Sequence, residues 1–419
     1  MNLPSRIERA VRQAMAAHDR PLCAYVYDLG ALRAHARRLV TTLPERCRLF
    51  YAIKANSDPS ILRALSGLVG GFEVASIGEA KRARKAKASI PIMFGGPGKT
   101  DEELAEAIQL GIQTLHVESL HELRRAQYIA ACLDKQVPVL LRVNIRGVLP
   151  TSTLRMGGSA TQFGLDEADV PEAIALAQAS PQSILRGFHF HSVSNNLDAA
   201  SHVELVRDYL RRAEHWARIS GLRVDYVNAG GGIGVNYAAL EQQFDWPAFV
   251  RGLKEVVEEN RLLQGVAILF ECGRYLTAFC GYYAAEVLDL KRNHGKPFVI
   301  VRGGSHHCRL PASWQHSQPF TVLPVDSWSY PFPRPEIRGE PITIAGQLCT
   351  PKDILARDCP IDRVRVGDVI VFHLVGAYGW SISHHDFLSH PHPARLYVDD
   401  EEIEMMKVGV FGSMDGRSS

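Results

Sequence analysis

The residues best suited to chemistry stand at the ends of short apolar runs. Lys54 follows the run FYAI, Arg142 stands in VPVLLRVNI, His189 and His191 in ILRGFHFHS, and Glu271 in AILFECGR. A lone lysine is usually solvated, but one that closes a buried strand is desolvated, which lowers the pKa of its amine and makes it an imine-forming nucleophile. The set predicts a site for a cofactor that carries a phosphate and a carbonyl group.

A triple glycine and a carboxylate refine this prediction. Gly230 opens the run GGG, but a dinucleotide fingerprint needs a sixth-position glycine where Val235 stands. Such glycines still let backbone N–H groups approach a phosphate, although a tight turn is the simpler interpretation. Glu271, if buried, needs a partner. An ion pair with Arg274 would serve, but we favour a pyridine nitrogen, which Glu271 would keep protonated as an electron sink for a carbanion.

The composition limits the possible partners and compartments. The 419 residues carry 47 basic and 45 acidic side chains, so the near-neutral charge gives no indication of nucleic acid or an anionic membrane as partner. The eight cysteines form no Cys-x-x-Cys motif, and no signal peptide or membrane-length apolar run is present. We expect a cytoplasmic protein with reduced thiols.

Eight apolar runs and the helical patterns between them must position these residues. The runs are LFYAIKAN, GFEVAS, IPIMFGG, TLHVES, VPVLLRVNI, ILRGFHFHS, VDYVNAGGG and AILFECGR. Alternation of this kind predicts an α/β fold, a (β/α)8 TIM barrel over residues 30–275, with its active site at the carboxyl ends of the strands. Thr100 and Glu103 form a capping box that marks one helix start.

The chain after Arg274 has a different pattern. Its β-branched runs and the turn Asn293–Gly295 predict an all-β C-terminal domain over residues 276–410, which residues 1–29 join through AYVYDL. Residues 411–419 are predicted to form a disordered tail.

Taken in order, the motifs resemble those of a known family. YAIKAN, FEVAS-x-x-E, HFH-x-x-S, GGG, E-x-G-R, a late Cys349 followed by Asp353, and GAYG are similar to the fold-type III pyridoxal 5'-phosphate (PLP)-dependent decarboxylases. This family includes the ornithine, arginine and diaminopimelate decarboxylases, and its barrel is of the alanine racemase type. The resemblance runs from about Tyr25 to Tyr397.

The resemblance implies roles for single residues. Lys54 would attach PLP covalently, His191 would stack on its ring and Glu271 would bind its pyridine nitrogen. Cys349 would come from the partner subunit of a homodimer with shared active sites and protonate Cα after CO2 leaves. The residues implied in phosphate binding are Ser194, Gly231, Gly232, Arg274 and Tyr378, and those implied around the ring are Glu79 and Arg142.

The substrate pocket departs from the family pattern. Members that act on small diamino acids carry an acid directly after the late cysteine, where this chain has Thr350. The segments expected to line the pocket are GGSHHCRLPASWQHSQPF and YGWSISHHDFLSHPHP. They hold cationic or neutral donors, which favour a substrate whose far end is a carboxylate. These segments resemble the siderophore-biosynthesis branch, of the staphyloferrin B type, whose substrates are citrate amides such as citryl-L-2,3-diaminopropionate. The predicted substrate residues are His306, His307, Arg309, Thr350, Asp353 and His384.

Other interpretations stay open at this point. The chain could decarboxylate free diaminopimelate or ornithine, or be a non-catalytic PLP-fold protein, which the retained Lys54 and Cys349 oppose. A racemase on the same barrel would typically face the ring nitrogen with an arginine, which Glu271 opposes. A zinc site is conceivable at four histidines, but the adjacent prolines indicate an irregular loop, so no metal is expected. The four are His384, His385, His390 and His392.

Overall fold

The computed structural model describes residues 3–17, 21–147, 154–155, 157–259, 265–399 and 402–406. The chain divides into two compact units, Arg33–Leu276 and Met1–Leu32 with Thr277–Ser419. The tail predicted over residues 411–419 lies outside the described residues.

Eight parallel strands close into a barrel in the first unit. Their order is β5-β4-β3-β2-β12-β11-β9-β6, and β6 pairs with β5 to complete the ring, which confirms the predicted fold. The strands are β2 (Cys47–Ala52), β3 (Gly71–Val74), β4 (Ile92–Phe94), β5 (Thr114–Val117), β6 (Val137–Asn144), β9 (Ser183–His189), β11 (Tyr226–Asn228) and β12 (Ala267–Cys272). Short strands β7 (Leu154–Arg155), β8 (Leu165–Asp166) and β10 (Val193–Ser194) lie in the loops.

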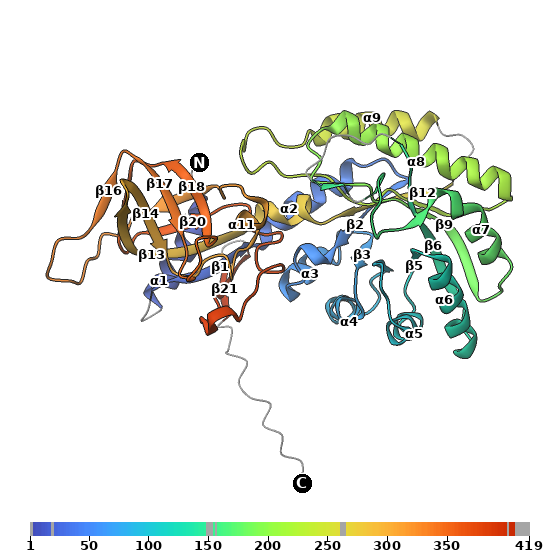
Figure 1. Ribbon diagram of the computed structural model, residues 1–419, viewed down its shortest axis with the longest axis horizontal. Helices are drawn as coiled ribbons and strands as arrows, with labels where there is room; N and C mark the ends of the chain where they lie inside the picture. Colours follow the sequence, from blue (N-terminus) through green and yellow to red (C-terminus); the bar gives the residue numbers. More distant parts are fainter. Residues whose placement is uncertain are drawn as a thin grey trace, which may run out of the picture. The chain divides into compact units, whose positions relative to one another are not determined.

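Helices lie outside these strands (Figure 1). They are α2 (Leu29–Thr42), α3 (Pro59–Leu65), α4 (Ile77–Ala86), α5 (Asp101–Gln109), α6 (Leu120–Cys132), α7 (Val170–Gln178), α8 (Ala199–Ser220), α9 (Trp246–Glu259) and α10 (Arg274–Thr277), with short 3₁₀ turns η1 (Ile53–Ala55), η2 (Glu167–Asp169) and η3 (Ala278–Cys280). Thr100 and Glu103 form the predicted capping box, and Ser76 and Ser119 cap α4 and α6. Each cap stabilises its helix by about 1 kcal/mol and begins the helix soon after a strand.

The barrel interior changes from apolar to polar along its strands. Phe50, Met93 and Leu269 form a buried cluster against Tyr226 and Ala267. Because side chains two residues apart share one face of a strand, Glu271 and Asn228 point into the same interior, nearer the carboxyl ends. Apolar packing therefore fills one part of the barrel and leaves polar groups at the end where the loops leave the strands.

The second unit is built on one nine-stranded sheet of order β18-β17-β14-β13-β1-β21-β22, with β20 pairing β13 and β15. The strands are β1 (Cys23–Asp28), β13 (Gly281–Asn293), β14 (Lys296–Val301), β15 (Phe320–Leu323), β17 (Pro341–Ala345), β18 (Ile354–Pro360), β20 (Val369–Phe372), β21 (Ala394–Asp399) and β22 (Glu402–Met406); β16 (Glu336–Arg338) pairs with β19 (Arg363–Arg365). The predicted hairpin is confirmed, because Asn293 pairs with Lys296. AYVYDL forms most of β1, in this sheet as predicted.

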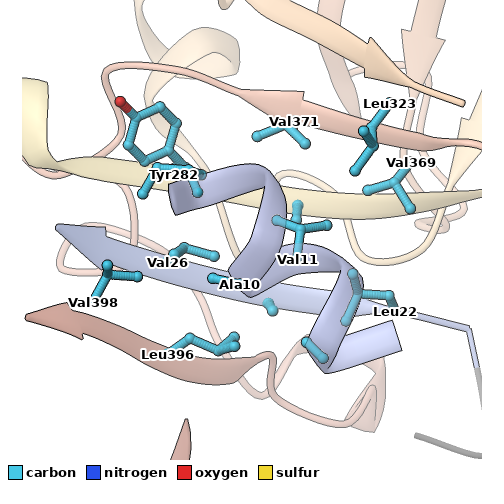
Figure 2. Packing of buried hydrophobic residues seen from close by; sticks show 14 residues of the cluster. Ala10, Val11, Leu22, Val26, Tyr282, Leu323, Val369, Val371, Leu396 and Val398 are labelled. Carbon is cyan, nitrogen blue, oxygen red and sulfur yellow. The ribbon is translucent and has the colours of Figure 1, made fainter. Parts of the chain in front are cut away.

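The expectation of an all-β unit was wrong at the N-terminus. Residues Ser5–Ala16 form α1, and short helical turns occur at α11 (Leu310–Trp314) and η4 (Phe387–Ser389). Ile7, Ala10, Val11 and Ala14 give α1 one buried face. Figure 2 shows Ala10 and Val11 over the sheet near Val26 and Leu396, in one hydrophobic cluster. The helix covers a sheet face that would otherwise expose apolar side chains.

Candidate active site

The lysine of the site stands at the mouth of the barrel. After β2 the chain turns through η1, and Nζ of Lys54 lies 3.4 Å from Oε2 of Glu73 at the end of β3. The Lys54 side chain is 41% exposed, so the prediction that it is buried was wrong. The 3₁₀ turn carries the residue beyond the last buried position of the strand. Lys54 thus meets Glu73 as a half-exposed ammonium.

Glu73 is the buried partner of this pair. Burial raises the pKa of its carboxyl to about 7, with Lys54 opposing this and Glu271 adding to it. A carboxyl with this pKa changes charge in the neutral range and can exchange a proton with a neighbouring amine.

Glu271 lies at the centre of a polar cluster inside the barrel. Its Oε1 accepts a hydrogen bond from Nδ2 of Asn228 at 2.7 Å and lies 3.3 Å from Nε2 of His189 and 3.8 Å from Nδ1 of His116. The two imidazoles stack with centroids 4.1 Å apart. Burial lowers the pKa of both well below the usual value, so both rings are neutral at pH 7.

The same three residues are close enough together to be considered as metal ligands. Ligand atoms of His116, His189 and Glu271 lie within 4.8 Å of one another. A metal binds an imidazole in the plane of the ring, and the planes of these stacked rings are only 22° apart, so one ion cannot align with both. Among the residues that the structure describes, the four histidines considered for zinc bring no three ligand atoms this close.

The glycines form a tight turn against the strand ends. Gly230 has a φ of 69°, and a Cβ there would lie 2.2 Å from the carbonyl oxygen of Phe190. A Cβ on Gly231 would lie 2.3 Å from the carbonyl oxygen of Glu271. The backbone N–H of Gly231 donates to Nδ1 of His191 at 3.0 Å, which leaves the proton of this neutral ring on Nε2. Only glycine allows the turn to pass this close to β12.

Cationic groups are held nearby in the same unit. Arg274 donates from Nη1 to the hydroxyl of Tyr237 at 3.0 Å. Arg142 donates to Oε1 of Glu118 at 2.6 Å, and Glu118 also accepts backbone N–H groups of Gly96 and Gly164. These contacts hold two guanidinium groups in fixed positions.

Two further predicted residues support loops of the barrel unit. Glu79 accepts the N–H of Ala75 at 2.8 Å, and burial raises the pKa of its carboxyl. Ser194 lies in β10 after the loop that carries His191. The role of each toward a cofactor stays a prediction.

The sheet unit carries the predicted cysteine on an ordered loop. Cys349 is exposed. Asp353 is buried, and its two oxygens accept the N–H groups of Ser305 at 2.6 Å and Leu348 at 2.8 Å. Asp353 therefore holds the loop of Cys349, and its predicted contact with substrate stays untested.

The sheet unit also contains the predicted residues His306, His307, Arg309, His384 and Tyr378. His306 is fully buried, and neither of its ring nitrogens has a hydrogen-bond partner. Burial lowers the pKa of His306 to about 4 and that of His307 to about 2. Arg309 approaches His384 with 3.4 Å between Nη1 and Nδ1. Tyr378 has a left-handed φ of 55°.

Comparisons with known proteins identify the family. Residues 29–278 match the family described as pyridoxal-dependent decarboxylase, pyridoxal binding domain, so the chain belongs to the PLP-dependent decarboxylases. A relative in Staphylococcus aureus, 2-[(L-alanin-3-ylcarbamoyl)methyl]-2-hydroxybutanedioate decarboxylase, is 48% identical over 94% of this chain and 98% of its own length. The L-glutamyl-[BtrI acyl-carrier protein] decarboxylase of Niallia circulans is 32% identical over 91% and 90% of the two chains.

Solved structures agree with this assignment. The diaminopimelate decarboxylase of Helicobacter pylori, in complex with L-lysine, has a TM-score of 0.82 at 29% identity and covers 94% of this chain and 95% of its own. In the residues that the structure describes, no helix is long and apolar enough to cross a membrane.

The residues present fit PLP. A buried carboxylate for a ring nitrogen, a neutral imidazole, a glycine turn that a Cβ would block and a lysine amine occur together in one unit. Glu118, His116 and Asn228 were missed as site residues. Two of them stand in TLHVES at the end of a barrel strand, a signal that could have identified them.

Proposed function

We propose that this chain decarboxylates a citrate amide of L-2,3-diaminopropionate at the α-carbon of its amino acid part. The observation that carries the proposal is the 48% identity, over 94% of this chain, to a relative named for that substrate. Such a conjugate has a free α-amine, an α-carboxylate and two further carboxylates on the citryl part.

Each of several residues in the barrel unit would have a separate role in the reaction. Bound PLP supplies the acceptor for the electron pair that remains on Cα when CO2 leaves. Lys54 would hold the cofactor through its amine. Glu271 would bind the ring nitrogen, and His191 would pack against the ring. Glu73, with its pKa near neutrality, takes up and returns a proton of Lys54.

The phosphate would be held by neutral donors and one cation of the barrel unit, and the role of Tyr378 of the sheet unit stays a prediction. Gly232 would offer a backbone N–H group, Ser194 a hydroxyl and Arg274 a guanidinium. The N–H of Gly231 is bound to His191, so Gly231 would contribute by having no Cβ. The Tyr237 contact orients that guanidinium. A turn without Cβ atoms lets the phosphate approach the backbone.

The sheet unit supports recognition of a carboxylate-rich substrate. Thr350 replaces the acid that would bind a distal ammonium. The exposed Arg309 and the half-buried His384 lie close to each other. His306 is neutral because burial lowers its pKa to about 4, and its ring nitrogens are unpaired. His306 is fully buried, so the contact predicted between its imidazole and a substrate carboxylate would require the side chains over it to move.

We further propose that Cys349 acts in the site of a partner subunit and that the enzyme is a cytoplasmic homodimer serving siderophore synthesis. Cys349 is exposed on a loop fixed by Asp353, which suits a residue presented to another chain. All eight cysteines are free, in agreement with a reducing compartment.

A substrate panel tests the proposal. CO2 release is measured from citryl-L-2,3-diaminopropionate, diaminopimelate and ornithine with the PLP-loaded protein. We expect efficient turnover of the conjugate alone. Comparable kcat/KM on diaminopimelate, the substrate named for the structural neighbours, would replace the citryl assignment and leave the decarboxylase assignment standing.

A further inference from the structure

The side-chain amide of Asn228 has an orientation set by the backbone. Its Oδ1 accepts the N–H of Gly230 at 2.9 Å, so its NH2 group must face the other way. Nδ2 then donates to Oε1 of Glu271 at 2.7 Å, and its second hydrogen faces Nε2 of His116 at 3.5 Å. The glycine turn thus determines that Asn228 presents its NH2 group, and not its carbonyl oxygen, to Glu271.

The orientation of the amide also determines the tautomer of His116. Because Nε2 of this neutral ring accepts from Asn228, the proton of the ring is on Nδ1, which faces Oε1 of Glu271 at 3.8 Å. Nε2 of His189 lies 3.3 Å from the same oxygen, and neither this nitrogen nor Nδ1 of His116 is aligned for a hydrogen bond to it. Asn228 therefore donates to Oε1, and the two imidazoles pack beside that contact.

The cluster is deeply buried. Asn228 and His116 are 0% exposed and His189 2% exposed. A buried carboxylate oxygen needs a hydrogen-bond donor, and a donor aimed at one oxygen fixes the orientation of the whole group. Without the Asn228 amide, Glu271 could turn away from the position in which it would meet a pyridine nitrogen.

We propose that Asn228, with His116 and His189 packed beside it, is a positioning residue that fixes the orientation of the Glu271 carboxylate, so that Oε1 is bound to the protein and Oε2 would be left for the ring nitrogen of PLP. The inference rests on the proposed function and adds three residues to it. They act through Glu271 and do not touch the reacting atoms.

The test measures the protonation of the ring nitrogen directly. The full chain is loaded with PLP carrying ¹⁵N in the ring, and the ¹⁵N chemical shift is recorded at pH 7 to 8. Wild type is expected to show a protonated nitrogen. Asn228→Leu, and independently His189→Phe, should move the shift toward the unprotonated value. Their kcat should fall by about tenfold or more with a smaller change in KM, as is usual for groups that orient a ligating residue.

A matched variant separates positioning from general disruption. Asn196 is also buried, and its side chain accepts the N–H of Asp198 and donates to a carbonyl group and a histidine nitrogen without meeting Glu271. Asn196→Leu should leave the ¹⁵N shift at the wild-type value. In a Glu271→Gln background, Asn228→Leu should cause no additional shift, because the group through which it acts is gone.

The outcomes distinguish the positioning role of Asn228 from the proposed function on which it rests. A protonated nitrogen in wild type and in both variants would overturn the positioning role and leave the proposed function intact. An unprotonated nitrogen in wild type would overturn the role of Glu271 itself. A shift in Asn196→Leu equal to that in Asn228→Leu would also reject the specific role of Asn228.

Discussion

Nζ of Lys54 lies 3.4 Å from Oε2 of Glu73, and the register of β2 and β3 pairs Ala52 with Glu73. The neighbouring strand ends therefore bring an amine and a carboxyl together at the barrel mouth. Since burial raises the pKa of Glu73 to about 7, this carboxyl can exchange a proton with the amine near neutral pH.

The pH dependence of stability should report this carboxyl. Its folded-state pKa lies above the ordinary 4.5, so the folded protein binds more protons between about pH 4.5 and 7 and its free energy of unfolding falls as pH rises through that range. Glu73→Gln should remove this fall in the free energy of unfolding, because the amide does not titrate. Relative to wild type, the variant should gain roughly 1 to 3 kcal/mol between pH 4.5 and 8, measured by urea unfolding of the cofactor-free chain.

Glu106→Gln is the matched control, because Glu106 pairs with Lys81 on an exposed surface. Its stability relative to wild type should change little over the same pH range. Parallel curves for wild type and Glu73→Gln would contradict the raised pKa.

Lys54→Ala should abolish covalent cofactor attachment. After borohydride reduction, mass spectrometry should find the cofactor on the peptide that contains Lys54 in wild type, and no adduct in the variant. CO2 release should fall by about a thousandfold or more. Lys81→Ala, which removes a different paired lysine, should keep the adduct. An adduct at another lysine in wild type would refute the assignment.

Gly231→Ala should weaken PLP binding because the new Cβ would lie 2.3 Å from the carbonyl oxygen of Glu271 and force the turn away from β12. We expect the Kd for PLP, from fluorescence titration, to rise by about tenfold or more. Gly67→Ala places its Cβ in open space and is the control. Equal affinity in the two variants would reject the predicted phosphate site.

Cys349→Ala should keep the visible absorption of bound cofactor and lose most product formation. Cys132→Ala, at another exposed cysteine, should be fully active. An unchanged kcat in Cys349→Ala would exclude this cysteine as the proton donor.

Mixing two inactive variants tests whether sites are shared. If Lys54 of one subunit works with Cys349 of the partner subunit, mixed Lys54→Ala and Cys349→Ala dimers regain one intact site, and random mixing should restore about a quarter of wild-type activity. No recovery after verified subunit exchange would show that each chain supplies its own cysteine.

The barrel could be predicted from sequence because inner strands of a parallel barrel are buried on both faces and appear as apolar runs. Lys54, His191 and Glu271 could be identified because they interrupt or end such runs. Helix α1 was missed, although the spacing of Ile7, Ala10, Val11 and Ala14 carries a helical period.

Other features of the site could be recognised only from the three-dimensional structure. Whether Lys54 is buried depends on one 3₁₀ turn, which no pattern of residue types indicates. The role of Asn228 depends on which way its amide points, and that is decided by the N–H of Gly230. Asp353 was predicted to contact substrate, but it accepts the backbone N–H of Leu348 in its own loop and that of Ser305, which is 48 residues away.

The placement of β1 has a consequence for biosynthesis. This strand lies between β13 and β21, whose residues begin at Gly281 and Ala394. During synthesis, β1 can therefore pair with β13 only after the barrel segment has been made, and with β21 only more than 360 residues after β1 itself. The barrel segment can begin folding earlier, whereas the sheet must await the synthesis of β21.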